Sequence, residues 1–359
     1  MKFLFFIAPG VGHLNPTLPI AQELVARGEE VVYCTTDKFQ ARVESTGATF
    51  RQLDDSFNMP DGEIAKLQEG SLALMEGILL IMLRYVTKTS LKVPKVLKQL
   101  QAEKFDALVY DPVFAWGHAL GEALGMPTAT FRCTFAMTQN SPLRRQMRLM
   151  AKKQLSPKII IAMLKLQLIA WYMNLRYRTS ILNPKNLFIA SESLNIVALP
   201  RKFQPDADVF DDRYEFVGPS ILPSIVDYEA DLPFKKLEEC QTLYIAMGTA
   251  FTKAQFFKTC LNTFTNTPWL VVMATWKDFG FNDSPSNVIV RHRVPQLEVL
   301  KRANVFVTHG GMGSVMGALW YGVPLVVVPQ MPEQSIIAAR VTELGLGIRL
   351  DPDVNAESL

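Results

Sequence analysis

Short apolar segments alternate with amphipathic segments along the whole chain. Residues 2–8 form a continuous apolar run after the first lysine, which is typical of a buried strand. Residues 15–28 then place apolar side chains from Leu18 to Val25 at helical spacing and stop at Gly28. Later strands are predicted at EVVYCTT, DALVY, TATF and NIVAL. Strands separated by helical patterns in this way predict a parallel sheet with helices on both faces.

The same pattern begins again in the last third of the chain. Five more strands are predicted at TLYIAMG, WLVVMAT, NVIVRHR, VFVTH and PLVVVPQ. Residues 216–233, between the two sets, are rich in proline and show little periodicity. A chain of 359 residues also exceeds what one core usually supports. We therefore expect an α/β protein with two doubly wound domains at 1–215 and 234–359, joined by a linker at 216–233.

Composition changes this picture little. Apolar residues make up 49% of the chain, charged residues 20%, and the net charge is +3, an ordinary balance for a globular protein. The four cysteines are far apart and show no metal-ligand spacing, so we expect free, buried thiols in a reducing compartment. Pro9-Gly10 ends the first apolar run, which favours a buried strand over a signal peptide. We therefore expect a cytoplasmic protein.

One segment has an unusual charge pattern. Residues 123–191 contain eleven Lys and Arg but no Asp or Glu, and the largely apolar stretch Ile159–Arg178 lies inside them. One interpretation is a buried helix with a solvated basic flank. The other is a surface that contacts something apolar and anionic, such as a hydrophobic acceptor or a membrane interface. The sequence leaves both open.

The first candidate for chemistry is the loop APGVGHLNP, Ala8–Pro16, which follows the first predicted strand. Ligands of open α/β sheets bind beyond the carboxyl ends of the strands, and His13 lies there. A histidine can accept a proton near neutral pH, and a carboxylate partner fixes its tautomer. Asp111 follows another strand and can reach the same edge. The alternatives are a structural histidine and a turn-capping aspartate.

The second candidate is the stretch from Thr308 to Ser314, THGGMGS, which follows a strand and opens a helix. Unpaired backbone N–H groups and the helix dipole favour a phosphate or diphosphate at such a place. His309 and Ser314 add side-chain donors. It is neither the phosphate-loop lysine motif nor GxGxxG. The alternative is an ordinary tight turn capped by Ser314.

Three stretches together resemble one family. They are Val294–Gly347, Gly10–Gly28 and Tyr110–Gly125, and they occur in the same order as in the UDP-glycosyltransferase family, bacterial macrolide and flavonoid branch. The resemblance implies the GT-B fold, in which two Rossmann-like domains face each other across a cleft. The N-terminal domain would hold the acceptor, and the C-terminal domain would hold the nucleotide sugar.

The resemblance also implies a reaction and its residues. His13 would be the general base, and Asp111 the carboxylate behind it. The reaction would be the inverting transfer of a hexose, with glucose the first choice, from a UDP-sugar to a hydroxyl of a hydrophobic small molecule. No metal, other cofactor or nucleic-acid partner is implied. The donor would be held at the diphosphate by Thr249, His309, Gly311, Gly313 and Ser314, at the base and ribose by Arg293, Val294 and Gln296, and at the sugar by Glu333 and Gln334.

The chain departs from the family pattern in four places. Gly317 replaces a glutamate that binds ribose, Arg293 replaces an aromatic residue, and Ala246 replaces a serine. The sequence also ends at Leu359, without the C-terminal helices that the resemblance implies. Two alternatives follow: a glycosyltransferase-like binding protein that has lost catalysis, and a peripheral membrane enzyme that glycosylates lipids through contact at 123–191.

Overall fold

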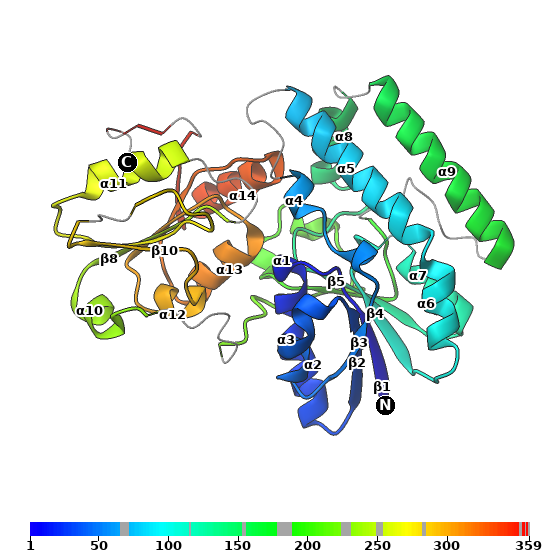
Figure 1. The fold of residues 1–359 in the computed structure, drawn as a ribbon. Helices are drawn as coiled ribbons and strands as arrows, with labels where there is room; N and C mark the ends of the chain where they lie inside the picture. The colour runs from blue at the N-terminus through cyan, green and yellow to red at the C-terminus, as the bar shows by residue number, and fades with distance from the viewer. Residues whose placement is uncertain are drawn as a thin grey trace. The chain divides into compact units, whose positions relative to one another are not determined.

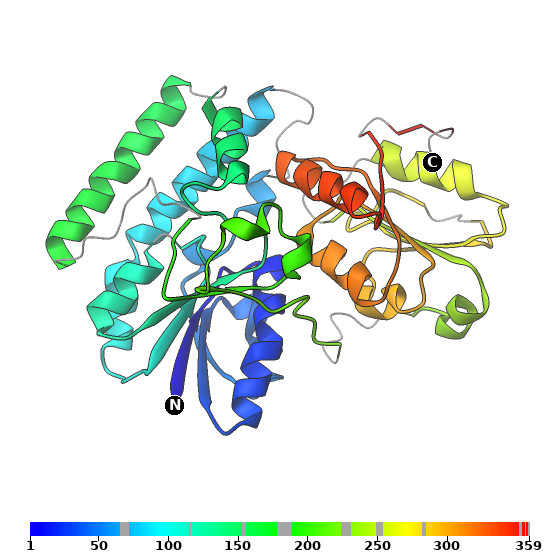
Figure 2. The ribbon, with the colours of Figure 1, turned by 180° about the vertical axis from the view of Figure 1, so that it is seen from behind.

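The protein is described here by a computed structural model, shown in Figure 1 and, from behind, in Figure 2. It describes residues 1–64, 72–114, 116–152, 156–177, 189–223, 231–248, 254–281, 285–351, 354–355 and 357. The chain divides into two compact units, Met1–Ser220 and Ile221–Leu359. The division falls inside the proline-rich stretch 216–233.

The first unit is built on a sheet of seven parallel strands in the order β3-β2-β1-β4-β5-β6-β7. Its centre is apolar because the middle strands are covered on both faces: Leu4, Phe5 and Phe6 are fully buried. The strands are β1 (Lys2–Phe6), β2 (Glu30–Thr35), β3 (Thr49–Gln52), β4 (Ala107–Tyr110), β5 (Thr128–Arg132), β6 (Leu194–Val197) and β7 (Tyr214–Phe216).

The helices of this unit connect the strands and cover the sheet (Figure 1). They are α1 (Val11–Leu14), α2 (Leu18–Ala26), α3 (Gln40–Glu44), α4 (Asp61–Ile64), α5 (Leu72–Ser90), α6 (Val93–Leu100), α7 (Gly117–Leu124), α8 (Pro142–Lys152) and α9 (Pro157–Tyr177). Single 3-10 turns lie at Asn15–Thr17, Asp37–Phe39, Asp55–Phe57, Arg201–Phe203 and Ala207–Val209. Both views show α9 running alongside α5, against which it packs.

The second unit contains six parallel strands in the order β10-β9-β8-β11-β12-β13. They are β8 (Thr242–Ala246), β9 (Leu270–Ala274), β10 (Val288–Arg291), β11 (Val305–Thr308), β12 (Leu325–Val327) and β13 (Gly347–Arg349). Its helices are α10 (Phe234–Glu239), α11 (Ala254–Phe264), α12 (Gln296–Leu300), α13 (Met312–Trp320) and α14 (Pro332–Glu343). The expectation of two doubly wound α/β units is confirmed.

Three strands were not predicted from the sequence, namely β3, β7 and β13. Each lies at the edge of its sheet, and each is only three or four residues long. An edge strand does not need two buried faces, so β3 (TFRQ) and β7 (YEF) carry polar residues where a central strand would be apolar. The apolar runs that revealed the central strands are therefore missing from these three strands, whereas β10, also at an edge, has the run VIVR and was predicted.

The interpretation of Ile159–Arg178 as a buried helix is wrong for most of its length. The stretch does form a helix, α9, but eight of its large apolar side chains are exposed. In the described part of the chain, α9 is the one helix long and apolar enough to cross a membrane, judged by length and composition.

Candidate functional site

The histidine and the aspartate of the first unit lie at the carboxyl ends of neighbouring strands. His13 is in α1, directly after β1, and Asp111 follows β4. β1 lies between β2 and β4, so the strand order reverses there and the chain leaves on both sides. Such a reversal opens a crevice at the carboxyl ends, where ligands of this fold class bind.

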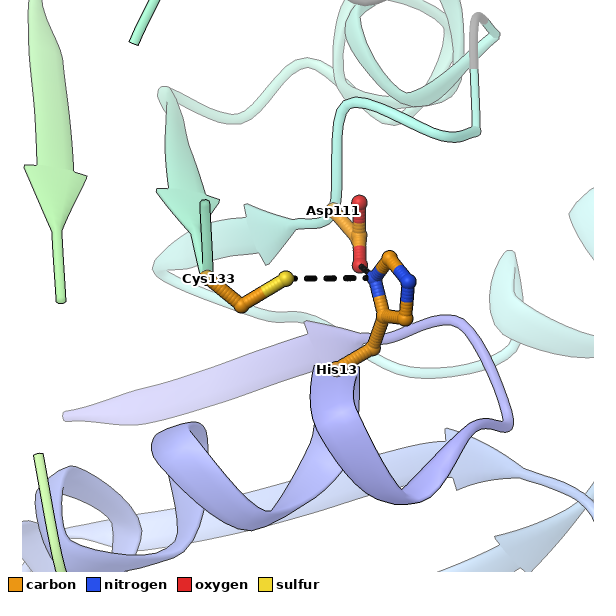
Figure 3. A group of neighbouring side chains, drawn as sticks. All are labelled: His13, Asp111 and Cys133. Atoms are coloured by element: carbon orange, nitrogen blue, oxygen red, sulfur yellow. Dashed lines mark hydrogen bonds and ion pairs between the residues drawn. The ribbon is translucent and has the colours of Figure 1, made fainter. Parts of the chain in front are cut away.

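The two side chains form a short hydrogen bond. Nδ1 of His13 lies 2.6 Å from Oδ2 of Asp111, and Figure 3 shows the second ring nitrogen directed away from the carboxylate. The carboxylate is buried, and its other oxygen, Oδ1, accepts the backbone N–H of Val113 at 2.9 Å. An ionised carboxylate only accepts, so His13 carries its hydrogen on Nδ1. Nε2 is then left as the acceptor.

A third side chain, which the sequence analysis did not single out, completes this group. Sγ of Cys133 lies 3.3 Å from Nδ1 of His13, at the end of β5 (Figure 3). Burial lowers the pKa of His13, but electrostatic interactions and hydrogen bonds with Cys133 and Asp111 outweigh it and hold that pKa well above its ordinary value. Cys133 follows the strand next to that of Asp111, so strand position alone could have identified it.

The four cysteines named from the sequence are free thiols, as expected. Cys34 and Cys260 are buried, and burial raises the pKa of each thiol to about 12. Cys133 and Cys240 are only partly buried, so the expectation of buried thiols is correct for two of the four. Of these four, Cys133 is the one whose sulfur contacts the His13 ring.

The same three residues present ligand atoms of the kinds that metals bind, all within 4.8 Å of one another. The separation of the nitrogen and oxygen atoms argues against a resident ion. Two ligands at about 2.0–2.1 Å from a tetrahedral zinc lie about 3.3 Å apart, whereas these atoms are 2.6 Å apart. That distance is a charge-assisted hydrogen bond. The group therefore has the geometry of a histidine with its orienting carboxylate.

The second unit places the predicted phosphate turn at the carboxyl edge of its sheet. His309 follows β11, and Gly311 caps α13. The imidazole lies over two glycines. A Cβ built on Gly248 would come within 2.7 Å of Cε1, and one built on Gly311 within 2.7 Å of Nε2. The glycines at 248 and 311 thus make the space in which this ring lies.

Burial keeps His309 neutral. Desolvation lowers the pKa of His309 to about 4, and a hydrogen bond to the backbone of Ala246 opposes that shift in part. At neutral pH the ring therefore carries no charge, and its single N–H donates to the backbone of Ala246. Ala246 ends β8, beside Thr308 in the sheet, so the alanine that replaces the family's serine still contributes through its backbone.

The residues after β12 meet the same turn. Gly310 has φ +84°, and a Cβ there would lie 2.6 Å from Cγ1 of Val327 and 3.9 Å from Cβ of Gln334. Oε1 of Gln334 accepts the backbone N–H groups of Gln330 and Met331 at 2.8 and 3.1 Å. Its amide nitrogen is the polar group left to face a ligand. Glu333, one residue earlier, is exposed in the first turn of α14.

The residues expected at the base lie at the ends of β9 and β10. The guanidinium of Arg293 stacks on the ring of Trp276, with Cζ 4.8 Å from the ring centroid. Trp276, which was not predicted from the sequence, adopts the left-handed backbone conformation at φ 55°. This conformation is unfavourable for a bulky side chain. Val294 is buried, and Gln296 opens α12. The missing aromatic residue at 293 is thus replaced by an arginine backed by an indole.

The remaining predicted residues are placed as follows. Gly313 is exposed and Ser314 half-buried in the first turn of α13, where the backbone N–H groups are unpaired within the helix. Gly317 is buried on the same helix, and a Cβ there would lie 3.2 Å from Cδ1 of Leu300 on α12. Thr249 lies outside the described residues.

Comparisons with known proteins find relatives of this chain in both sequence and fold. Residues 270–359 match the family model described as "Erythromycin biosynthesis protein CIII-like, C-terminal domain". The chain is 36% identical to the NDP-glycosyltransferase YjiC of Bacillus licheniformis, across 99% of this chain and 86% of that protein. It is 32% identical to the uncharacterized UDP-glucosyltransferase YojK of Bacillus subtilis, across 98% and 85%. The solved glycotransferase of kitacinnamycin has a TM-score of 0.79 at 27% identity, across 99% and 88%.

The chain belongs to the UDP-glycosyltransferase family. Its two parallel-sheet, Rossmann-like units are those of the GT-B fold. It is therefore a glycosyltransferase that moves a sugar from a nucleotide sugar, which is the co-substrate of the reaction. The resemblance drawn from the three sequence stretches is confirmed.

Proposed function

We propose that this glycosyltransferase moves a hexose from a UDP-sugar to a hydroxyl of a hydrophobic small molecule and inverts the configuration of the anomeric carbon. Glucose is the hexose that we propose first. The observation that carries the proposal is the 2.6 Å bond between Nδ1 of His13 and Oδ2 of Asp111. It leaves Nε2 as a proton acceptor at the crevice where a ligand of this fold class binds.

His13 acts as the general base. Its Nε2 takes the proton of the acceptor hydroxyl while the hydroxyl oxygen forms a bond to the anomeric carbon. The bond between that carbon and the diphosphate oxygen breaks at the same time, from the opposite side, so the configuration inverts. Asp111 is a positioning residue: it fixes the tautomer and stabilises the imidazolium that forms. The proton leaves on His13, and the electron pair leaves on the diphosphate.

The second unit holds the donor. The first turn of α13, with Gly311, Gly313 and Ser314, receives the diphosphate on unpaired N–H groups at the positive end of the helix. His309 adds a donor to the diphosphate when its free ring nitrogen takes up a proton, and Thr249 is proposed beside the same phosphates. The positive end of the α13 helix dipole stabilises the negative charge that develops on the leaving diphosphate.

Base, ribose and sugar are assigned to the neighbouring strand ends. Arg293 on Trp276 offers a flat cationic face for the uracil ring, with Val294 and Gln296 beside it. Glu333 and the amide nitrogen of Gln334 are proposed to bind sugar hydroxyls. The glucosyltransferase name of the relative YojK supports glucose as the first donor to test.

The surroundings of His13 support a hydrophobic acceptor. Val11, two residues before it, is an exposed apolar side chain. A Cβ built on Gly10 would lie 3.4 Å from Cδ2 of His13 and 3.5 Å from Cγ of Met59. The flexible Met59 side chain therefore lies next to the same glycine as the base, and methionine adapts to apolar ligands of varied shape. We assign 1–215 to the acceptor, 234–359 to the donor and the protein to the cytoplasm.

The alternative is a relative that binds the donor without catalysis, and Gly317 is the residue that favours it. The decisive measurement is UDP release with UDP-glucose and a panel of phenolic, macrolide and terpenoid hydroxyl compounds. A β-linked product from the α-linked donor, lost in His13→Ala, supports inverting transfer. UDP binding without any release across the panel would favour the alternative.

A further inference from the structure

The outer surface of α9 is the most unusual surface of the first unit. Eight of the seventeen exposed large apolar side chains in the described part of the chain belong to this one helix. They are Ile160, Ile161, Met163, Leu164, Leu168, Trp171, Tyr172 and Leu175. A soluble surface normally carries such side chains singly, so a continuous apolar face marks a contact with something outside the chain.

The opposite side of α9 is already used. Ile159, Leu166, Ala170 and Met173 are buried and belong to the apolar core of the first unit. They recur at intervals of seven, four and three residues, which is one stripe of a helix with 3.6 residues per turn. Figures 1 and 2 show α9 lying alongside α5, the helix that it contacts. The helix is thus fixed to the unit by one side, and Leu168, Trp171 and Leu175 point away from it.

Charge flanks the exposed apolar face. Lys158, Lys165 and Arg176 are exposed, and their spacing of seven and eleven residues puts them along one side of the helix. α9 contains no acidic residue, and the sequence from 123 to 191 contains none either. An apolar face bordered by a row of cations on one helix is the arrangement of helices that lie in a membrane interface.

We propose that α9 docks the protein on an anionic lipid bilayer, lying in the interface with its apolar face in the acyl region. The row of cations argues for this occupant, because anionic headgroups attract Lys and Arg next to the surface. A second copy packed through the same face would offer only the same cations. The buried stripe of α9 argues for a helix that lies on the bilayer over one that crosses it.

Docking would have a consequence for the acceptor. A hydrophobic hydroxyl compound partitions into the bilayer, and an enzyme held at its surface meets the compound there. This step rests on the proposed function, whereas the docking itself does not. The two can be separated because vesicle binding is measured without donor or acceptor.

The test is flotation of the full chain with vesicles of phosphatidylcholine alone or mixed with phosphatidylglycerol. We expect binding to the mixed vesicles, a blue shift of tryptophan emission on binding, and release at high salt. Lys158→Gln with Lys165→Gln should weaken binding roughly thirtyfold, because each cation near the surface contributes about fivefold.

The apolar part is tested with Leu168→Ser, Trp171→Ser and Leu175→Ser combined. These side chains are 65–67% exposed, so the fold does not depend on them, and binding should be lost. The matched control is Leu91→Ser with Trp320→Ser, which removes apolar side chains 55% and 50% exposed elsewhere and should bind as the parent does. Circular dichroism and UDP binding confirm that each variant is folded.

Three results would overturn the proposal. Equal binding to neutral and anionic vesicles would show that the cations play no part. Equal loss in the control variant would show that any exposed apolar side chain suffices. A dimer in sedimentation velocity that disappears in the triple serine variant, with no vesicle binding by the parent, would assign the face to a second copy.

Discussion

Asp111 uses one carboxylate oxygen for the backbone and the other for His13. Oδ1 accepts the N–H of Val113 at 2.9 Å, and Oδ2 lies 2.6 Å from Nδ1 of His13. The first bond fixes the carboxylate relative to the end of β4, so the second can fix the ring. Because Asp111 is buried, few alternative arrangements are open to the pair.

Asp111→Asn should therefore reduce the turnover number far more than it changes stability. An amide in this place can donate as well as accept, so it no longer favours the hydrogen on Nδ1 and no longer stabilises the imidazolium. We expect a loss of roughly 10²- to 10⁴-fold in kcat, the usual contribution of a general base. UDP affinity, measured by calorimetry, should stay unchanged. An equal fall in UDP affinity would point to misfolding instead.

Cys133→Ser should move the pH dependence of the reaction. Burial lowers the pKa of His13, but its interactions with Cys133 and Asp111 raise that pKa above its ordinary value, and only the neutral ring can act as a base. The rate should thus rise with pH through that raised pKa. Without its interaction with Cys133 the pKa of His13 falls, so the rising limb of kcat/KM moves to lower pH. An unchanged rising limb would show that Cys133 does not affect the pKa of His13. Cys240→Ser, another partly buried thiol, is the control.

Arg293→Ala should weaken UDP binding about 5- to 150-fold, the range for loss of one stacked base. The guanidinium lies 4.8 Å from the Trp276 ring centre, so Trp276→Ala should have a smaller effect of the same sign, through the loss of its support. Both variants should bind inorganic diphosphate as the parent does, because that ligand has no base. Equal losses for UDP and diphosphate would place Arg293 at the phosphates. Calorimetry with the two ligands makes the comparison.

The elements that could be predicted from the sequence were those whose residues must satisfy two physical constraints at once. Central strands must be apolar on both faces, and a glycine turn between strand and helix must be open, so β1, β11 and the turn at His309 were predictable. The edge strands β3, β7 and β13 satisfy only one constraint and were missed, whereas the edge strand β10 carries an apolar run and was predicted. The same holds for side chains: His13 and Asp111 were found from loops with distinctive residues, whereas Cys133 and Trp276 follow ordinary strands. The position of its strand could have identified Cys133, but only the contacts show that it meets His13 and that Trp276 meets Arg293.

The exposure of α9 could not be read from composition either. An apolar helix is usually buried, and the spacing of Ile159, Leu166 and Met173 fits a buried stripe. The sequence does not reveal that this stripe alone is buried. Which side of an apolar helix is buried depends on which other elements pack against it, and this is decided by the tertiary structure.

UDP binding should become tighter as the pH falls, through His309. Burial lowers the pKa of the free ring to about 4, and a bound diphosphate would raise it because an anion favours the charged form. Between the two pKa values, binding takes up a proton, so affinity rises as the pH falls through the higher one. Calorimetry in buffers of different ionisation enthalpy measures this uptake. His309→Gln should remove it, leaving only the proton linkage of UDP itself. The same uptake in His309→Gln would exclude the ring as its source.

Gly317→Glu should not recover the ribose contact that the family pattern implies. A Cβ at 317 would lie 3.2 Å from Cδ1 of Leu300 and 3.4 Å from Cδ2 of Leu297, so the new side chain would start in the apolar contact between α12 and α13. A carboxylate that begins there is desolvated, which costs roughly 2 kcal/mol or more of unfolding free energy. We expect a lower midpoint in urea and no gain in UDP affinity.

A double-mutant cycle with Leu300→Ala separates crowding from desolvation. Leu300 is fully buried, so its truncation alone should cost about 2–5 kcal/mol. If the two side chains compete for the same space, the combined variant should lose less than the sum of the single losses. Strict additivity would show that Leu300 does not oppose the glutamate. Tighter UDP binding by Gly317→Glu alone would show that the side chain reaches the ribose, and that α12 gives way to it.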